Sequence, residues 1–260
     1  MQIFRTFFKK EIFAEVLLPD KATTKVAIFC DGAPSAPRNR DMMGFFAKKG
    51  YAAFHIRYRG MWESKGLFLQ KSLDQDLIDV IDALPKGFTD LWTKKRYAIA
   101  PKHIVLVGAS FGGPAVILAS RDPRVNKVIA ISPVVDWRKD GKAERMKDWI
   151  PFMLEAYSMA YRASRARWNK LLNGMFYNPV AHAQEIDGSK IFILHAKDDD
   201  VVPFIPIRQF ARKIKATLVA RSVGGHLRTS LITQPILWKK ISKFLKASSR
   251  SMTTRSQVSS

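Results

Sequence analysis

The stretch of sequence that decides the fold reads Ile104-Val-Leu-Val-Gly-Ala-Ser-Phe-Gly-Gly113. Its first four residues are apolar and predict a buried strand, and residues 111–121 predict the helix that follows. Between the two lies the pattern G-x-S-x-G, which places Ser110 on a very sharp turn from strand to helix. The flanking glycines remove side chains that would collide with this turn. We therefore expect the Ser110 hydroxyl above the edge of a sheet, beside the unpaired N–H groups that begin the helix.

Apolar runs and amphipathic runs alternate on both sides of this stretch. Strands are predicted within residues 8–18, 26–30, 51–58, 104–107, 125–132, 191–194 and 216–223. Helices are predicted over residues 38–49, 73–84, 111–121 and 230–247. Apolar strands that alternate with helices are typical of a mostly parallel sheet covered on both faces. With right-handed crossovers this is a doubly wound α/β fold.

The segment 137–185 breaks this alternation. It is too long for a plain crossover, and it is rich in Trp, Tyr, Met and Arg. We interpret it as a helical cap, or lid, over the sheet edge that carries Ser110, because the preceding strand emerges there. Its aromatic residues suit either an apolar pocket or the insertion's own core. Residues 1–136 and 186–247 then form the α/β core, and residues 248–260 form a flexible basic tail.

The composition excludes several classes of protein. Of the 260 residues 47% are hydrophobic, so a large core is available and global disorder is excluded. The chain carries 44 Lys and Arg against 22 Asp and Glu, a net charge of +22, which attracts polyanions in general. No helix-turn-helix, RNP or zinc-finger pattern accompanies this charge, so we expect no specific nucleic acid partner. The single cysteine, Cys30, and five scattered histidines indicate neither a disulfide framework nor a metal site.

The beginning of the sequence bears on the location of the protein. Residues 1–11 are not typical of a signal peptide, because their longest apolar run is two residues. No segment contains the roughly 18 uninterrupted apolar residues that indicate a transmembrane helix. We therefore expect a cytoplasmic protein without a membrane span.

A serine nucleophile needs a base, and the base needs an acid that orients it. Two later stretches hold candidates, His195-Ala-Lys-Asp-Asp-Asp-Val-Val-Pro203 and Val223-Gly-Gly-His226. Each follows a predicted strand, and open α/β sheets bind their ligands at the carboxyl ends of strands. His226 is the candidate base, because a loop histidine after two glycines can reach over the sheet.

These motifs together resemble the α/β-hydrolase superfamily, and within it the branch of dienelactone hydrolase and the prolyl-oligopeptidase-like esterases and peptidases. The resemblance covers roughly residues 24–247. That branch often carries H-G-x-x-D-x-x-V-P around its acid, and the match to His195 and to Val202-Pro203 places the acid at Asp199. Ala196 stands in place of the usual glycine, and we interpret His195 as structural. Other acids stay open, namely the neighbours Asp198 and Asp200, and Asp136 after an earlier strand.

The resemblance also implies an oxyanion hole of two backbone N–H groups. One belongs to Phe111, the residue after the nucleophile. The other is implied for Ala33 in the loop Cys30-Asp31-Gly32-Ala33-Pro34, since Pro34 has no N–H. The family often has His-Gly here, whereas this chain has Asp31 before the glycine, and a plain Asp-Gly turn is the alternative.

The resemblance finally implies a serine hydrolase. An acyl-enzyme would form on Ser110, with His226 as the base, Asp199 as the orienting acid and the N–H groups of Phe111 and Ala33 binding the oxyanion. We predict an enzyme of the carboxylesterase type that acts on a small-molecule ester without a metal or organic cofactor.

Alternatives of other classes stay open. Aspartate at position 110 would have indicated an epoxide hydrolase or a dehalogenase, and cysteine would have indicated dienelactone hydrolase itself. A serine peptidase or thioesterase of the same fold is one alternative, although the chain shows no propeller of the kind that prolyl-oligopeptidase-type peptidases carry. A non-catalytic binding protein with this fold is the other. The sequence predicts no particular oligomeric state.

Overall fold

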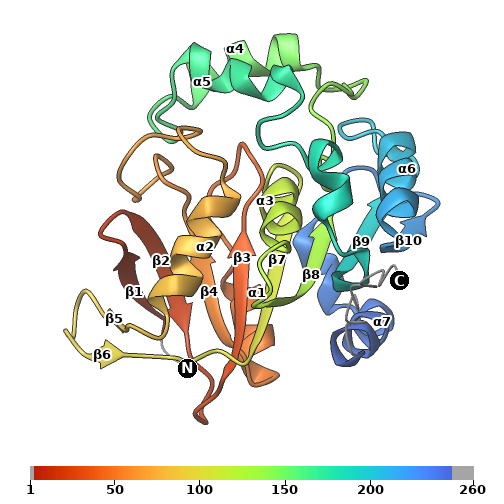
Figure 1. Cartoon of the computed structure of the whole chain (residues 1–260). Helices are drawn as coiled ribbons and strands as arrows, with labels where there is room; N and C mark the ends of the chain where they lie inside the picture. Colours follow the sequence, from red (N-terminus) through yellow and green to blue (C-terminus); the bar gives the residue numbers. More distant parts are fainter. Residues whose placement is uncertain (1–2, 248–260) are drawn as a thin grey trace, which may run out of the picture.

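The computed structural model describes residues 3–247, which are built around a sheet of eight strands (Figure 1). The strands lie side by side in the order β1-β2-β4-β3-β7-β8-β9-β10. β2 pairs antiparallel with β1 and with β4, and every later pair is parallel. The bounds are β1 (Ile3–Phe8), β2 (Ile12–Leu17), β3 (Lys25–Cys30), β4 (Ala52–Ile56), β7 (His103–Ala109), β8 (Val125–Ile131), β9 (Ile191–Ala196) and β10 (Thr217–Arg221).

Helices cover both faces of this sheet (Figure 1). Side chains of α1 and α7 pack with Ala27 and Phe29 of β3, whereas those of α2, α3 and α6 pack with Val26 and Ile28 on the other face. The bounds are α1 (Arg40–Lys48), α2 (Asp74–Ala83), α3 (Gly112–Ala119), α6 (Phe204–Ile214) and α7 (Pro235–Lys246). The predicted α/β-hydrolase fold, with a mostly parallel and doubly wound sheet, is confirmed.

The parallel strands are apolar along their whole length because both of their faces are covered. All five residues of β4 and all six of β9 are buried, so successive side chains enter opposite cores. This explains the continuous apolar runs in the sequence. Because the strands are parallel, β7, β8, β9 and β10 end at one edge of the sheet, and the loops that follow them meet there.

Several elements differ from the prediction. β1 begins at Ile3, before the predicted range 8–18, and a short hairpin of β5 (Phe88–Thr89) and β6 (Arg96–Tyr97) was not predicted. α7 begins at Pro235, after the 3-10 turn η4 (Thr229–Thr233), because proline suits the first helical position. α6 was also missed, although its buried residues have helical spacing. The predicted flexible tail, 248–260, lies outside the described residues.

Residues 146–169 of the segment 137–185 lie across the carboxyl ends of the strands, whereas residues 179–185 pack beside α3 and α6 (Figure 1). The segment contains α4 (Met146–Ala156), α5 (Arg165–Asn169) and the 3-10 turns η1 (Lys170–Asn173) and η2 (Pro179–Glu185), and η3 (Gly188–Lys190) then leads into β9. It is less helical than expected, since irregular chain separates these short elements. Three backbone hydrogen bonds join it to the loop after β4, from Trp62 N–H to Ala160 O (2.9 Å), from Arg162 N–H to Gly60 O (2.8 Å) and from Phe68 N–H to Arg162 O (3.0 Å). Across residues 3–247 no helix has the length and apolar character needed to cross a membrane.

Candidate active site

Ser110 stands on the turn between β7 and α3. Its φ of 50° lies in the left-handed region that residues other than glycine rarely adopt, as expected for a nucleophile on a sharp turn. Its N–H donates to Ile131 O (2.9 Å), and its carbonyl accepts from Gly113 N–H (3.0 Å). A Cβ on Gly108 would lie 2.4 Å from the carbonyl oxygen of Gly112, so the close approach of strand and helix requires a glycine.

His226 and Asp199 form a hydrogen-bonded pair at the same edge of the sheet. His226 Nδ1 lies 2.9 Å from Asp199 Oδ2 and 3.2 Å from Asp199 Oδ1. The Asp199 side chain is buried after β9, and its Oδ1 also accepts the N–H groups of Val201 (3.1 Å) and Val202 (2.9 Å). Burial alone would raise the pKa of Asp199, but the hydrogen bonds from His226 and Val202 hold this pKa below its usual value. An ionised Asp199 can therefore hold the His226 ring with its Nε2 free to accept a proton.

The other acids named from the sequence have different partners. Asp198 accepts the N–H groups of Gly224 (3.1 Å) and Gly225 (3.0 Å), and so fixes the loop that carries His226. Asp136 forms an ion pair with Arg138, with 2.9 Å between Oδ1 and Nε. The carbonyl of Asp200 accepts the N–H of Ala143 (2.9 Å) in the insertion. Of the four candidates, Asp199 is the one that contacts His226 in the part of the chain that the structure describes.

Ser110 and His226 follow β7 and β10, whose carboxyl ends lie at the same edge of the sheet. Over the described residues, no hydrogen bond joins their side chains, and His226 is about a quarter exposed. Catalytic hydrogen bonds are often long in enzymes without substrate and shorten when the site is occupied. The geometry therefore leaves His226 oriented by Asp199 and its Nε2 unengaged.

His195 lies beneath this pair at the end of β9. Its ring is fully buried, and its Nε2 donates to Val202 O at 2.9 Å, which supports the turn that presents Asp199. Burial lowers the pKa of His195, so the ring is neutral near pH 7. Its Nε2 lies 3.6 Å from Asp199 Oδ2, beyond hydrogen-bonding distance. This environment agrees with a structural residue.

Two backbone N–H groups lie beside Ser110. Ala33, Ser110 and Phe111 line one cavity. A Cβ on Gly32 would lie 3.2 Å from Ser110 Cβ and 3.7 Å from Ser110 Oγ, so the loop after β3 passes directly next to the nucleophile. Within residues 3–247, neither Ala33 N–H nor Phe111 N–H donates a hydrogen bond. Two unpaired donors next to a serine are the arrangement that can bind an oxyanion.

Comparison with protein families places the chain among known enzymes. Residues 39–230 match the model of the prolyl oligopeptidase family. The chain belongs to this family. The resemblance to the prolyl-oligopeptidase-like branch is thus confirmed, and with it the predicted class of serine hydrolase. A comparison with curated protein sequences gives no match.

Solved structures share the fold of this prolyl oligopeptidase family member. An esterase of Pyrococcus furiosus is 18% identical with a TM-score of 0.66, over 94% of this chain and 89% of that one. A thermophilic esterase of Thermogutta terrifontis, solved with butyrate bound, is 18% identical with a TM-score of 0.61, over 93% of each chain. An α/β hydrolase of a Penicillium species is 16% identical with a TM-score of 0.67, over 92% of this chain and 94% of that one. At these identities the likeness shows the fold.

The cavity beside Ser110 is small, with a volume of about 50 Å³. The insertion contributes Trp137 and Trp149 to its lining, and α6 contributes Ile207. Among the other large aromatics of the insertion, Trp168, Tyr161 and Tyr177 are buried in the core, whereas Phe152 is exposed. The insertion of this family member therefore supplies a pocket wall, and its buried aromatics join the core on that face of the sheet, where Trp168 packs against Phe68 and Phe111.

Two residues that hold the site were missed by the sequence analysis. The Tyr177 hydroxyl donates to Phe111 O (2.6 Å) and accepts from Ala115 N–H (3.1 Å), so it ties the insertion to the start of α3. Asp198 was considered only as a rival acid, whereas it anchors the His226 loop. Neither role has a local sequence signal, because each contact joins segments distant in the chain. No cluster of three or more metal-ligating side chains was found within residues 3–247.

Proposed function

We propose that the protein is a serine esterase that cleaves small carboxylic esters through an acyl-enzyme on Ser110. The observation that carries this proposal is the hydrogen bond between Asp199 and His226 at the sheet edge that also bears Ser110. A serine on a strained turn, an oriented imidazole and two unpaired N–H groups are the parts that acyl transfer requires.

Acylation begins when His226 Nε2 accepts the proton of the Ser110 hydroxyl. Ser110 Oγ attacks the ester carbonyl carbon, and the carbonyl oxygen becomes an oxyanion that the N–H groups of Ala33 and Phe111 bind. Asp199 remains ionised and stabilises the imidazolium that forms on His226. The tetrahedral intermediate then breaks its bond to the alcohol oxygen, which takes the proton from His226 and leaves.

Deacylation repeats these steps with water. His226 removes a proton from the water as it attacks the acyl carbon, and the same two N–H groups bind the second oxyanion. Collapse of the intermediate returns the proton to Ser110 Oγ and releases the carboxylic acid. The residues of this chain supply every proton transfer in the cycle.

The small cavity supports a short acyl group. Its volume of about 50 Å³ and its walls of Trp137, Trp149 and Ile207 leave little room for a long chain. The esterase of Thermogutta terrifontis was solved with butyrate and with propionate bound, both short acids. We infer that residues 137–185 form a cap that selects the acyl group, and that residues 1–136 and 186–247 form the catalytic core.

We further propose a cytoplasmic location. The one cysteine of the chain, Cys30, is buried on β3 and unpaired. Disulfides are common in secreted proteins and rare in the cytosol, and a chain without them suits the latter.

The experiment is a substrate panel with the purified protein. It compares p-nitrophenyl acetate, butyrate and octanoate with a prolyl p-nitroanilide, the amide that a peptidase would cleave. We expect kcat/KM for acetate or butyrate to exceed that for octanoate by at least about tenfold, since steric exclusion outweighs the gain of about 0.8 kcal/mol per methylene. Faster cleavage of the anilide than of any ester would contradict the esterase assignment and indicate a peptidase.

A further inference from the structure

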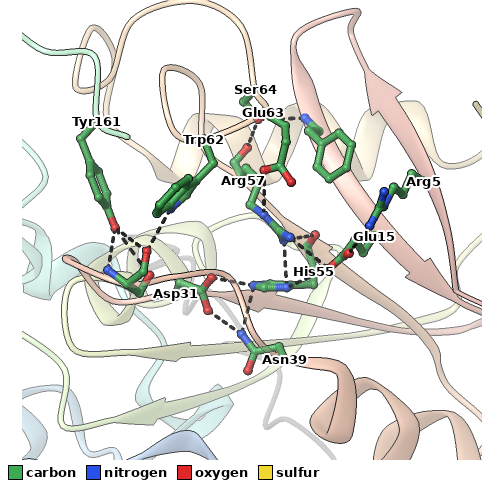
Figure 2. Close-up of polar contacts among 12 residues, drawn as sticks. Arg5, Glu15, Asp31, Asn39, His55, Arg57, Trp62, Glu63, Ser64 and Tyr161 are labelled. Carbon is green, nitrogen blue, oxygen red and sulfur yellow. Dashed lines mark hydrogen bonds and ion pairs between the residues drawn. The ribbon is translucent and has the colours of Figure 1, made fainter. Parts of the chain in front are cut away.

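The loop that carries Ala33, residues 31–35, is held from the core by a buried histidine (Figure 2). Asp31 directly follows β3, and its Oδ2 accepts from His55 Nε2 at 2.7 Å. Its Oδ1 accepts from Asn39 Nδ2, just before α1. His55 lies on β4, next to β3 in the sheet, and its ring is fully buried. The first residue of the loop is thus fixed to the neighbouring strand.

An arginine behind His55 sets the direction of this hydrogen bond (Figure 2). Arg57 NH1 donates to His55 Nδ1 at 2.8 Å and to the backbone carbonyl of His55 at 3.1 Å. Since a guanidinium only donates, His55 Nδ1 must accept, and the ring proton sits on Nε2, where it is donated to Asp31. Arg57 is 2% exposed and its NH2 donates to Glu15 at 3.0 Å. A chain of polar contacts therefore runs from Glu15 on β2 to the 31–35 loop.

The other end of the 31–35 loop is held by residues outside the sheet (Figure 2). Ser35 N–H donates to the Tyr161 hydroxyl at 2.9 Å, and Tyr161 belongs to the 137–185 insertion. Trp62 Nε1 donates to Ser35 O at 2.9 Å. Within the loop, Ser35 Oγ donates to Gly32 O at 2.8 Å. Ala33 lies between these two points of attachment.

A contribution to stability does not by itself explain why the polar contacts from Glu15 to Asp31 are buried. Desolvation of an ion pair offsets much of its attraction, and apolar side chains of similar volume stabilise a core at least as well. These polar contacts end on a loop that passes within contact distance of Ser110 and presents an unpaired N–H there. A rigid attachment matters at this point, because a displaced oxyanion donor loses most of its effect.

We propose that Asp31 and His55 are positioning residues of the oxyanion hole: together they fix the 31–35 loop so that Ala33 N–H faces the oxyanion formed at Ser110. Tyr161 fixes the far end of the same loop. The inference rests on the proposed function, since it assigns these residues to that same site. It also explains Asp31 in place of the histidine that the family often has here, because an acid can accept the His55 proton.

The test is the kinetic effect of Asp31→Asn on ester hydrolysis. The oxyanion exists only in the transition state, so a misplaced donor should lower kcat and kcat/KM equally and leave KM within about twofold. We expect kcat to fall by about 10- to 100-fold, less than for outright loss of a donor. The affinity for a boronic acid inhibitor, whose tetrahedral adduct places an oxygen in the hole, should fall by the same factor.

The matched control is Asp76→Asn. Asp76 is a buried carboxylate on α2 that pairs with Arg59 and has no contact with the 31–35 loop in the described residues. This variant should lose thermal stability as Asp31→Asn does but keep kcat. If both variants lose stability and both keep kcat, or if Asp31→Asn raises KM alone, Asp31 is purely structural and the proposal is overturned.

Variants at His55 and Tyr161 test the proposal even if Asp31→Asn does not fold. His55→Gln keeps a donor near the Nε2 position and should retain more kcat than His55→Leu, which has none. Tyr161→Phe removes only the hydroxyl at the far end of the loop and should lower kcat without affecting the buried ion pairs. Equal kcat in His55→Gln and His55→Leu, together with unchanged kcat in Tyr161→Phe, would contradict the proposal.

Failure of the proposed function would be recognised separately. Wild-type protein that neither reacts with a fluorophosphonate at Ser110 nor hydrolyses any ester is no esterase, whatever Asp31 does. In that case the rate of backbone hydrogen exchange in residues 31–35 tests the positioning role without an activity assay. Faster exchange in Asp31→Asn than in Asp76→Asn supports it, and equal exchange overturns it.

Discussion

A hydrogen bond of 2.9 Å joins Asp199 Oδ2 to His226 Nδ1, although the two residues follow different strands. β9 and β10 are parallel neighbours, so their carboxyl ends lie side by side and their loops meet. Asp198, the preceding residue, instead accepts the N–H groups of the two glycines before His226. Adjacent carboxylates thus have separate tasks, one toward the imidazole and one toward the loop that carries it.

The first prediction concerns this acid. Asp199→Asn should lower kcat for p-nitrophenyl acetate by about 10⁴-fold, the loss seen in a serine protease when the imidazole takes the wrong tautomer. Asp198→Asn, Asp200→Asn and Asp136→Asn should each cost far less, and serve as controls. A large loss in Asp136→Asn with a small loss in Asp199→Asn would move the acid to the loop after β8.

The second prediction concerns the turn at Ser110. A Cβ on Gly112 would lie 2.5 Å from Asp31 O and 2.7 Å from Cys30 O, so Gly112→Ala should push α3 away from the 31–35 loop. We expect esterase activity to fall at least about tenfold, because one oxyanion donor lies at the start of α3 and the other lies in the 31–35 loop, so the two would move apart. The control is Gly44→Ala in α1, where a Cβ meets nothing within 4 Å and should stabilise the helix by about 0.5–1 kcal/mol. Equal activity of the two variants in the ester assay would argue against the close approach.

The third prediction concerns the pocket wall supplied by the insertion. Trp149→Ala enlarges the cavity beside Ser110 and should raise the ratio of octanoate to acetate hydrolysis by about tenfold or more. Phe152→Ala is the control, because Phe152 is an exposed residue of the same helix and does not line the cavity. A chain-length profile that Trp149→Ala leaves unchanged would contradict a substrate-selecting cap.

The fourth prediction concerns stability in acid. The neighbours His55 and Arg57 lower the pKa of Glu15 from its usual 4.5 to about 2. Because the pKa is lower in the folded protein, ionised Glu15 stabilises the fold above about pH 4.5, and this contribution is lost as the pH falls toward 2. Glu15→Gln should therefore reduce the free energy of unfolding at pH 7 by about 1 kcal/mol, after allowance for solvent screening.

Urea denaturation at several pH values measures this effect. The difference between wild type and Glu15→Gln should be constant near neutral pH and shrink below about pH 4.5. Glu155→Gln, at an exposed position on α4, should differ little from wild type at pH 7. A difference for Glu15→Gln that persists undiminished near pH 2 would contradict the depressed pKa.

Much of the fold could be predicted from the sequence because its strands carry their own signal. The runs at 26–30, 104–107 and 191–194 are continuously apolar, since both faces of β3, β7 and β9 are covered, and they lie in strands of the structure. α6 was missed although Ile207, Phe210 and Ile214 carry a helical period. The insertion was harder to predict, because its short elements depend on contacts with the loop after β4.

Some residues of the candidate site could also be predicted from the sequence, and others could not. Ser110 and His226 could be named because glycines and strand ends mark them locally, and Asp199 because a family motif surrounds it. His55 and Tyr161 could not, since a histidine inside an apolar strand and a tyrosine among many aromatics give no sign of their partners. Asp31 was recognised only as a departure from the family, and its bond to His55 emerges only when β3 and β4 lie side by side.

Covalent labelling of Ser110 tests the central claim most directly. Wild-type protein and Ser110→Ala are treated with a fluorophosphonate, and the modified peptide is identified by mass spectrometry while hydrolysis of p-nitrophenyl acetate is followed. We predict one adduct on Ser110 in the wild type, none in Ser110→Ala, and a loss of kcat of at least about 10³-fold in that variant with its fold intact. Labelling at another residue, or hydrolysis by Ser110→Ala at the wild-type rate, would contradict the account.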